Sequence, residues 1–246
     1  MSAVDEAVAA GERSIGALLD NANALTAVIT SSFPAMSLDE VHAKFAAMPT
    51  PADSKAGLNP EVVKLCGVVR QHASAAVEEF KSCEMWLAMK VPSVSDGNNF
   101  GVDVQNFVCG ELIAMRTKVA GMLDVLSTYH WQRGLGVEKL PGGKSSETSQ
   151  VESAENEEKD GEKKASSKST KTTTTKATKE SGIGDFKEYC VALDVKAYHA
   201  AYLHLTDIRN CYVKASVLFS KNMKRLADPR GEGEDGGQNR NVMSMF

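Results

Sequence analysis

The sequence predicts an all-α protein whose subunit is an antiparallel four-helix bundle. Apolar residues recur at alternating spacings of three and four over four long segments, which is the period of a buried helix face. No segment shows the strict alternation of a half-buried strand, and breaks rich in proline, glycine or polar residues separate the four segments. A chain of 246 residues, of which 42% are hydrophobic, can bury one such core. A single four-helix domain is therefore expected over residues 1–246.

The first long helix is expected over residues 3–29. Its stripe has alternating spacings of four and three, and alanine, the best helix former, is frequent in it. Phe33-Pro34 ends the helix, because proline disfavours the helical conformation for the residue before it. The stripe consists of Val4, Val8, Gly11, Ile15, Leu18, Ala22, Leu25 and Ile29.

Residues 35–59 are expected to connect the first two long helices. Pro49, Pro51 and Gly57 prevent any long element, although residues 38–48 suit a short helix.

The second long helix begins at Asn59-Pro60, where asparagine caps the helix and proline takes the first helical position. Val91-Pro92 ends it. The third helix is expected over residues 102–129, whose stripe runs from Val104 to Tyr129.

Residues 142–182 are expected to form a disordered charged insert. They are rich in lysine, acidic residues, serine and threonine and almost lack apolar side chains, so they cannot offset the entropy of ordering. The fourth helix follows over residues 185–227, with a bend or phase shift near residues 194–196. Residues 228–246 form a flexible tail that is glycine-rich and acidic until its apolar close.

Composition and motifs argue against several other functions. The formal net charge of −4 lacks the basic excess of a nucleic-acid binder, and no apolar run is long enough to cross a membrane. The N-terminus is acidic and does not resemble a secretory signal, while five widely spaced cysteines suggest reduced thiols in the cytoplasm or nucleus. We found no metal-ligand spacing, phosphate loop or nucleophile motif, so no cofactor, metal or catalytic residue is predicted.

One segment between the second and third long helices is unusually specific. Its turn residues favour tight turns and positive φ, and Pro92 fixes the entry, so the loop should hold one conformation. An ordinary interhelical turn would also explain this pattern. The segment comprises Ser93, Val94, Ser95, Asp96, Gly97, Asn98, Asn99, Phe100 and Gly101.

The string Asp-Gly-Asn-Asn-Phe-Gly-Val-x-Val-Gln over residues 96–105 resembles the activation loop of the 11S proteasome activators, the PA28 or REG family. Further likenesses occur in the same order along the chain, over residues 25–48 and 58–232 without the insert. They are Ser32-Phe33-Pro34, Trp86, Gly184-Asp185-Phe186, residues 207–212 (Asp-Ile-Arg-Asn-Cys-Tyr), residues 221–226 (Lys-Asn-Met-Lys-Arg-Leu) and Pro229-Arg230-Gly231-Glu232.

This resemblance implies a heptameric ring, formed with itself or related subunits, that caps the 20S proteasome α-ring without ATP. It implies that residues 93–101 contact the proteasome gate and that the C-terminal residues Met243, Ser244, Met245 and Phe246 anchor the ring in pockets between α subunits. No nucleic acid or membrane is expected as a partner.

The chain also departs from the family pattern. Its charged insert lies between the third and fourth long helices instead of the first and second, Ser95 replaces a frequent acidic residue, and the longer tail ends in phenylalanine instead of tyrosine. Two alternatives therefore stay open: a structural helical oligomer or adaptor without gating activity, and, more remotely, an enzyme with an unrecognised site.

Overall fold

The structure is a computed structural model of the chain, and it describes residues 2–48, 58–93, 99–138, 140 and 184–231. All regular structure in these residues is helical. The five helices are α1 (Ala3–Ser32), α2 (Leu38–Ala46), α3 (Pro60–Lys90), α4 (Phe100–Glu138) and α5 (Gly184–Ala227). The predicted all-α class and the four long helices are thus confirmed, and the short helix expected in the connector is present as α2.

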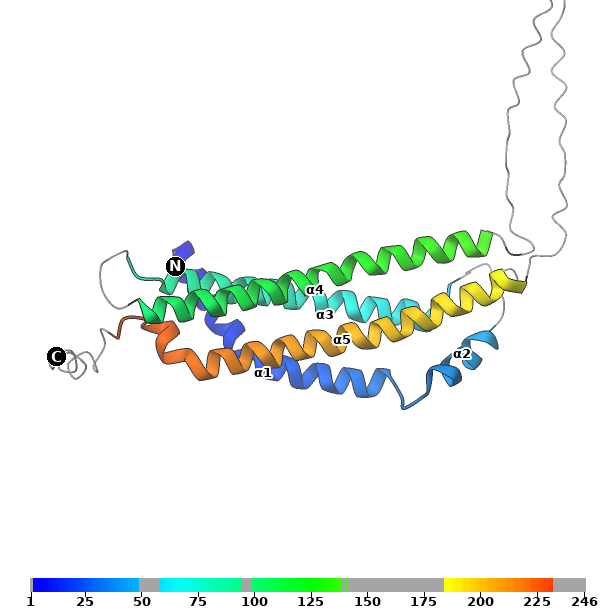
Figure 1. The fold of residues 1–246 in the computed structure, drawn as a ribbon, viewed down its shortest axis with the longest axis horizontal. Helices are drawn as coiled ribbons and strands as arrows, with labels where there is room; N and C mark the ends of the chain where they lie inside the picture. Colours follow the sequence, from blue (N-terminus) through cyan, green and yellow to red (C-terminus); the bar gives the residue numbers. More distant parts are fainter. Residues whose placement is uncertain (1, 49–57, 94–98, 139, 141–183, 232–246) are drawn as a thin grey trace, which may run out of the picture.

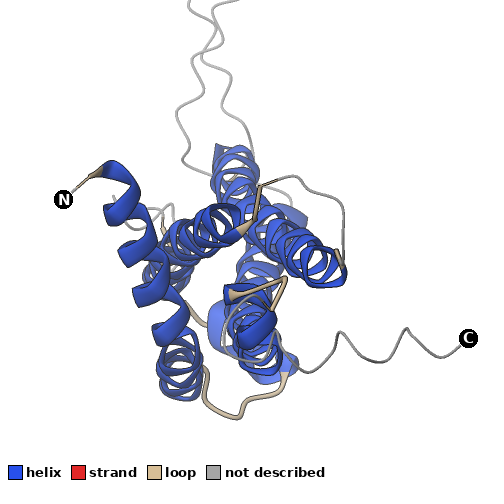
Figure 2. Cartoon of the chain, turned by 90° about the vertical axis from the view of Figure 1, so that its left-hand side faces the viewer, coloured by secondary structure: helices blue, strands red, loops and turns tan. Residues whose placement is uncertain are grey.

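The four long helices form an elongated bundle (Figure 1). α1 and α4 run in one direction, and α3 and α5 run in the other. α1 packs on α3 and α5, α4 packs on the same two helices, and α3 also touches α5 across the centre. The view along the bundle shows the helices side by side around a common interior (Figure 2). Since α1 and α4 each pack on both α3 and α5, they lie on opposite flanks of the α3–α5 pair.

Local sequence explains where several helices begin. Ser2 and Asp5 form a capping box at the start of α1, and Ser37 and Glu40 form another at the start of α2. Asn59 caps α3, as predicted, by accepting hydrogen bonds from the first backbone N–H groups of that helix.

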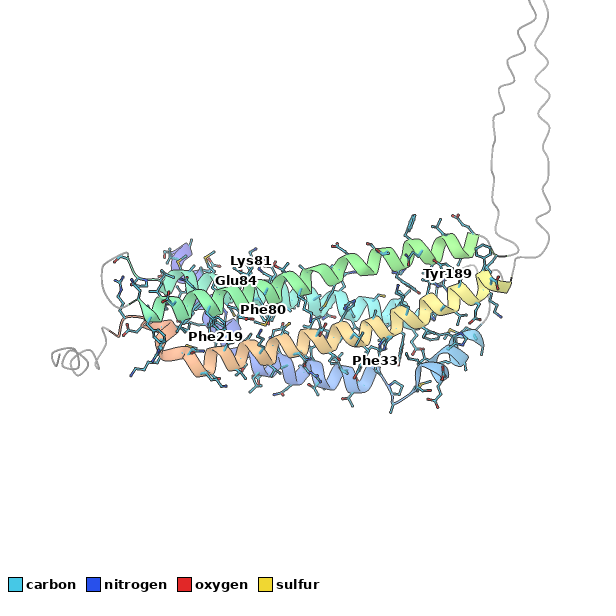
Figure 3. All side chains as sticks on the ribbon, in the orientation of Figure 1. Phe33, Phe80, Lys81, Glu84, Tyr189 and Phe219 are labelled. Carbon is cyan, nitrogen blue, oxygen red and sulfur yellow. The ribbon has the colours of Figure 1, made fainter. Side chains whose placement is uncertain are left out.

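The core consists mostly of the predicted stripes, but Val4 of the first stripe is exposed and lies outside it. Phe80 of α3 and Phe219 of α5 are among the largest fully buried side chains, and both are labelled in Figure 3. The Phe80 ring lies 5.2 Å from that of Tyr212, and the Phe219 ring lies 6.1 Å from that of Trp86. Burial of each such side chain contributes about 1.5–3 kcal/mol. All five cysteines are free, and only Cys109 is more than slightly exposed.

α4 extends nine residues beyond its predicted end at Tyr129, to Glu138. The next stripe position after Tyr129 is Arg133, a charged residue that ends an apolar pattern but is buried in the structure. The Arg133 guanidinium binds the carboxylate of Asp194, with an Nε–Oδ1 distance of 2.7 Å.

The predicted bend near residues 194–196 does not interrupt α5, which is one continuous helix from Gly184 to Ala227. The apolar stripe is interrupted there because Asp194 is a buried residue that accepts hydrogen bonds. Besides Arg133 it binds the Tyr129 hydroxyl at 2.8 Å and the Asn59 amide at 3.1 Å. Burial and the negative charge of Asp194 raise the pKa of Tyr129, so this hydroxyl remains a donor. Burial alone would lower the pKa of Arg133, but the hydrogen bond and charge of Asp194 raise it.

Candidate functional site

The predicted loop and the root of the predicted tail lie at the same end of the bundle. α3 ends, α4 begins and α5 ends there, at the left of Figure 1. Of the predicted loop the structure describes Ser93, Asn99, Phe100 and Gly101; residues 94–98 lie outside the described residues, as do the tail residues 243–246.

Gln105 joins the three chain segments at this end. Its side-chain amide, on the second turn of α4, donates hydrogen bonds to the carbonyl oxygens of Lys90 at 3.1 Å and Leu226 at 2.8 Å. These carbonyls belong to the last turns of α3 and α5, where helices leave carbonyl groups without helical partners. Gln105 is 1% exposed, and its bond to Leu226 is buried while its bond to Lys90 is partly buried. One side chain thus fixes the start of the loop relative to the start of the tail.

Gly101 allows α4 to begin directly against the tail root. A Cβ atom at this position would lie 1.9 Å from the carbonyl oxygen of Pro229 and 2.5 Å from its carbonyl carbon. Both atoms are backbone and cannot rotate away, so only glycine fits without moving one segment. The end of the predicted loop and the start of the tail are therefore in direct backbone contact.

Two arginines of the α5 end complete the connection. Arg230 donates from Nη2 to the carbonyl oxygen of Ser93 at 2.8 Å, which joins the tail root to the first residue of the predicted loop. The guanidinium of Arg225 lies 4.6 Å from the centre of the Phe100 ring, within range of a cation–π contact. The loop is thus held at both ends by groups from the C-terminal region.

The chain leaves α5 in a defined direction. The Asp228 carboxylate accepts the N–H of Gly231 at 2.9 Å, and Gly231 has a φ of 67°, a conformation that glycine adopts most readily. The N–H of Asp228 in turn bonds to the carbonyl oxygen of Lys224 at 3.0 Å. This turn fixes the conformation of the chain from the end of α5 to Gly231.

The chemistry of this end suits contact with another protein. It offers backbone groups, an exposed Phe100 ring and cationic side chains, held by hydrogen bonds on rigid helices. Within the described ranges, no cluster of three or more histidine, cysteine, aspartate or glutamate side chains could hold a metal ion. The helices that the structure describes include none that is long and apolar enough to cross a membrane.

Sequence reasoning placed the loop but missed the residues that hold it. Gln105 was noted only as the end of a motif string. A signal for it exists, because Gly101, Gln105, Val108 and Leu112 follow one another at helical spacings, which puts a polar side chain on a buried face. Arg225 and Arg230 gave no signal of this kind, since their partners are distant in sequence.

Comparison with protein families gives a match to proteasome activator PA28, C-terminal, over residues 55–145 and 144–236, well over half of the chain. The curated proteins include similar ones named proteasome activator complex subunit 3, from Homo sapiens and Gallus gallus. Each is 22% identical over 177 residues, which cover 72% of this chain. The chain spans about half the length of these relatives, since the match covers 55% of each.

Solved structures with a similar fold include the 11S subunit of the Plasmodium falciparum proteasome, PA28. It has a TM-score of 0.57 and 16% identity over 92% of this chain and 91% of that one. The similarity to a chain from a proteasome–11S activator complex has a TM-score of 0.58, with 14% identity over 90% of this chain and 89% of that one. These likenesses support the fold, and the family match over residues 55–236 shows that the chain belongs to the proteasome activator PA28 family.

Proposed function

We propose that this chain is an ATP-independent activator of the 20S proteasome that acts from the cytoplasm or the nucleus. Seven copies, identical or mixed with related subunits, would form a ring on the proteasome α-ring. Residues 243–246 would anchor each copy, and residues 93–101 would hold the gate open. The observation that carries this proposal is the pair of hydrogen bonds by which Gln105 ties the last turn of α3 to the last turn of α5.

This connection matters because anchoring and gating are separate tasks. A tail in a pocket supplies affinity through its terminal carboxylate and extended backbone. Each tail alone binds weakly, but after the first tail has bound, the others bind as if intramolecular. The ring is thus held by the tails, and the loop need contribute little affinity.

The loop opens the gate only if it contacts the open state better than the closed one, because only differential contacts shift a conformational equilibrium. Such contacts need a defined position. The backbone contact of Gly101 with Pro229 and the Arg230–Ser93 bond support this, because they tie both ends of the proposed loop to the tail root. Binding energy from the tails therefore places the loops, so that no nucleotide hydrolysis is needed. The chain itself would be a regulator and would hydrolyse nothing.

The test is peptide hydrolysis by purified 20S proteasome with and without the purified chain. We expect stimulation by the parent and none by a chain lacking residues 243–246, which should keep its helix content and its ring. Asn98→Tyr places a bulky ring in the predicted turn. It should bind proteasome and compete with the parent but fail to stimulate.

A structural oligomer or adaptor would give another pattern. It would bind or assemble equally well with either change and would not stimulate in any form. Stimulation by Asn98→Tyr equal to that of the parent would remove the gating role from residues 93–101.

A further inference from the structure

A cavity of about 100 Å³ lies between α4 and α5, in the half of the bundle away from the loop and the tail root (Figure 1). Its walls come from Tyr129 and Gln132 of α4 and from α5 between Leu193 and His204, and Cys66 of α3 also lines it. The cavity is partly open to solvent, and most of its wall is apolar. Protein interiors rarely leave a space this much larger than a water molecule, so the cavity requires an explanation.

The sequence of α5 leaves this space open. Ala197, Ala200 and Ala201 line the cavity, whereas buried positions further along the same helix carry Leu205 and Ile208. Because an alanine side chain ends at Cβ, α5 does not reach across to α4 at this level. A fully packed bundle would place larger side chains here.

One polar group in the wall has no partner. His204 lines the cavity, and its Nε2 atom is buried without a hydrogen-bond partner among the residues that the structure describes. Burial lowers the pKa of His204, so the imidazole is neutral near pH 7, and Nε2 accepts or donates one hydrogen bond according to its tautomer. A buried polar atom costs stability unless something pairs with it. A hydroxyl group suits it, because a hydroxyl can both donate and accept.

Lys196 supplies the charge at this cavity. Of the lining residues within the described part of the chain, it is the only one that is charged at pH 7. Lys196 is exposed and forms no ion pair with any residue that the structure describes. Asp194, two residues earlier, is not available to it, because its carboxylate is bound by Arg133 at 2.7 Å. An unpaired ammonium group beside an apolar cavity favours an anionic ligand.

The α4 wall is held in place next to this lysine. The Tyr129 hydroxyl and the Arg133 guanidinium both bind Asp194, which fixes the Tyr129 ring as a flat apolar surface. Gln132 lies between them in α4 and is therefore level with this part of α5, close to Lys196. It is half-buried and has no hydrogen-bond partner in the described ranges, so its amide can add a second donor for an anion.

The spacing of the polar groups sets the shape of the ligand. Lys196 and His204 are eight residues apart, which is about 12 Å along the helix axis. The long lysine side chain can turn toward the cavity and shorten this span. A drug-sized ligand fills a pocket of about 300–1,000 Å³, so this smaller cavity takes a single ring or a short chain.

We propose that the cavity binds a small monocarboxylic acid with an apolar, ring-sized body and a hydroxyl group at its far end. Lys196 and Gln132 hold the carboxylate, Tyr129 and the alanines of α5 contact the body, and His204 pairs with the hydroxyl. The site is separate from the loop and the tail, and its test needs no proteasome.

Isothermal titration calorimetry of the full chain with 3-(4-hydroxyphenyl)propionate tests the site. A ligand of this size should bind with a Kd on the order of 0.1–1 mM. Two analogues separate the polar contacts, because 3-phenylpropionate lacks the hydroxyl and 4-propylphenol lacks the carboxylate. Each should bind at least about fivefold more weakly than the probe, because a protein group then loses its partner.

Variants of the wall locate the binding. Lys196→Met removes the charge at an exposed position and should raise the Kd at least about fivefold. Lys187→Met is the matched control, because Lys187 is an exposed lysine of the same helix that does not line the cavity, and it should bind as the parent does. Ala200→Leu fills the space and should abolish binding with unchanged helix content. In His204→Leu the hydroxyl should no longer improve affinity, so the probe and 3-phenylpropionate should bind equally.

The outcomes decide the proposal. Saturable binding by the parent that is weakened in Lys196→Met and lost in Ala200→Leu would support it. No saturable binding up to about 10 mM would show that the cavity holds water only and would overturn it. Equal binding by the parent, Lys196→Met and Ala200→Leu would place the acid elsewhere on the chain and overturn it as well. Tighter binding of 4-propylphenol than of the probe would contradict the carboxylate.

Discussion

The side-chain amide of Gln105 donates a hydrogen bond of 2.8 Å to the carbonyl oxygen of Leu226, across 121 residues of sequence. The same nitrogen bonds to the carbonyl oxygen of Lys90 at 3.1 Å. The start of α4 is thus bonded to the ends of α3 and α5. The two segments proposed to contact the proteasome, the loop and the tail, begin at those two ends. Any loosening of this junction should affect how the loop is placed before it affects how the tail binds.

Gln105→Leu should therefore weaken stimulation more than binding. It changes the side-chain volume little but leaves the buried Leu226 carbonyl and the partly buried Lys90 carbonyl without their donor, which costs about 1–3 kcal/mol. Urea unfolding should report this loss, and peptide hydrolysis by 20S proteasome at saturating activator should fall. Asn106→Ala, which changes the exposed neighbouring residue, is the control and should behave as the parent. Full stimulation by Gln105→Leu would mean that the junction does not position the loop.

Gly101→Ala tests the backbone contact at the same end. The added methyl group would overlap the Pro229 carbonyl, and relief requires α4 and the tail root to separate. Overpacking of this kind costs about 1–3 kcal/mol, and stimulation should fall with it. Gly134→Ala is the matched control, because Gly134 is exposed on the same helix with nothing within 4 Å. It should be neutral or stabilising by up to about 1 kcal/mol. Equal melting temperatures for the two variants would contradict the contact.

Periodicity predicted the architecture well because burial of one face per helix dominates the energetics. The apolar stripes predicted the first and last residues of α1, α3 and α5 to within a few positions. Proline or a capping asparagine marked where these helices end or begin. α4 was predicted too short for one reason. The buried face of α4 continues past Tyr129, but the apolar pattern ends because the next position on that face is the charged residue Arg133. Its partner Asp194 lies 61 residues away in the sequence.

The candidate site was predicted from resemblance to a family and not from periodicity. Its loop was identified by likeness to a family, while the contacts that hold it were not predicted. Gln105, Gly101 and Arg230 each act on a partner more than 100 residues distant or across the bundle end, and no local pattern encodes such a pairing. Of these residues, only Gln105 could have been detected from the sequence, because it is a polar residue on an apolar helix face.

The buried Arg133–Asp194 pair should matter for stability and not for gating, since it lies far from the loop end. Asp194→Ala removes the carboxylate that the buried Arg133 guanidinium binds, with 8% of the Arg133 side chain exposed, which should cost about 3–5 kcal/mol in urea unfolding. The combination of Asp194→Leu with Arg133→Met removes both charges and should recover only the part of that loss that comes from the broken ion pair, because the Tyr129 hydroxyl and the Asn59 amide still lack their acceptor. Glu78→Ala breaks the exposed Glu78–Lys81 pair and should cost no more than about 1 kcal/mol. If the double variant were as unstable as Asp194→Ala, loss of the ion pair would not explain the destabilisation of Asp194→Ala.

The last prediction concerns residues 145–181, which lie within the predicted insert. The segment joins the end of α4 to the start of α5, at the end of the bundle opposite the loop and tail root (Figure 1). These two helices already pack closely there, because a Cβ at Gly136 would lie 2.8 Å from the Cys190 sulfur and 3.1 Å from the Tyr189 ring. A short Gly/Ser linker in place of residues 145–181 should therefore connect them without strain. We expect unchanged ring mass in light scattering and stimulation within about twofold of the parent, since closing a shorter loop costs little entropy. Loss of the ring in this deletion, with helix content retained, would give the insert a part in assembly that neither its composition nor its attachment point predicts.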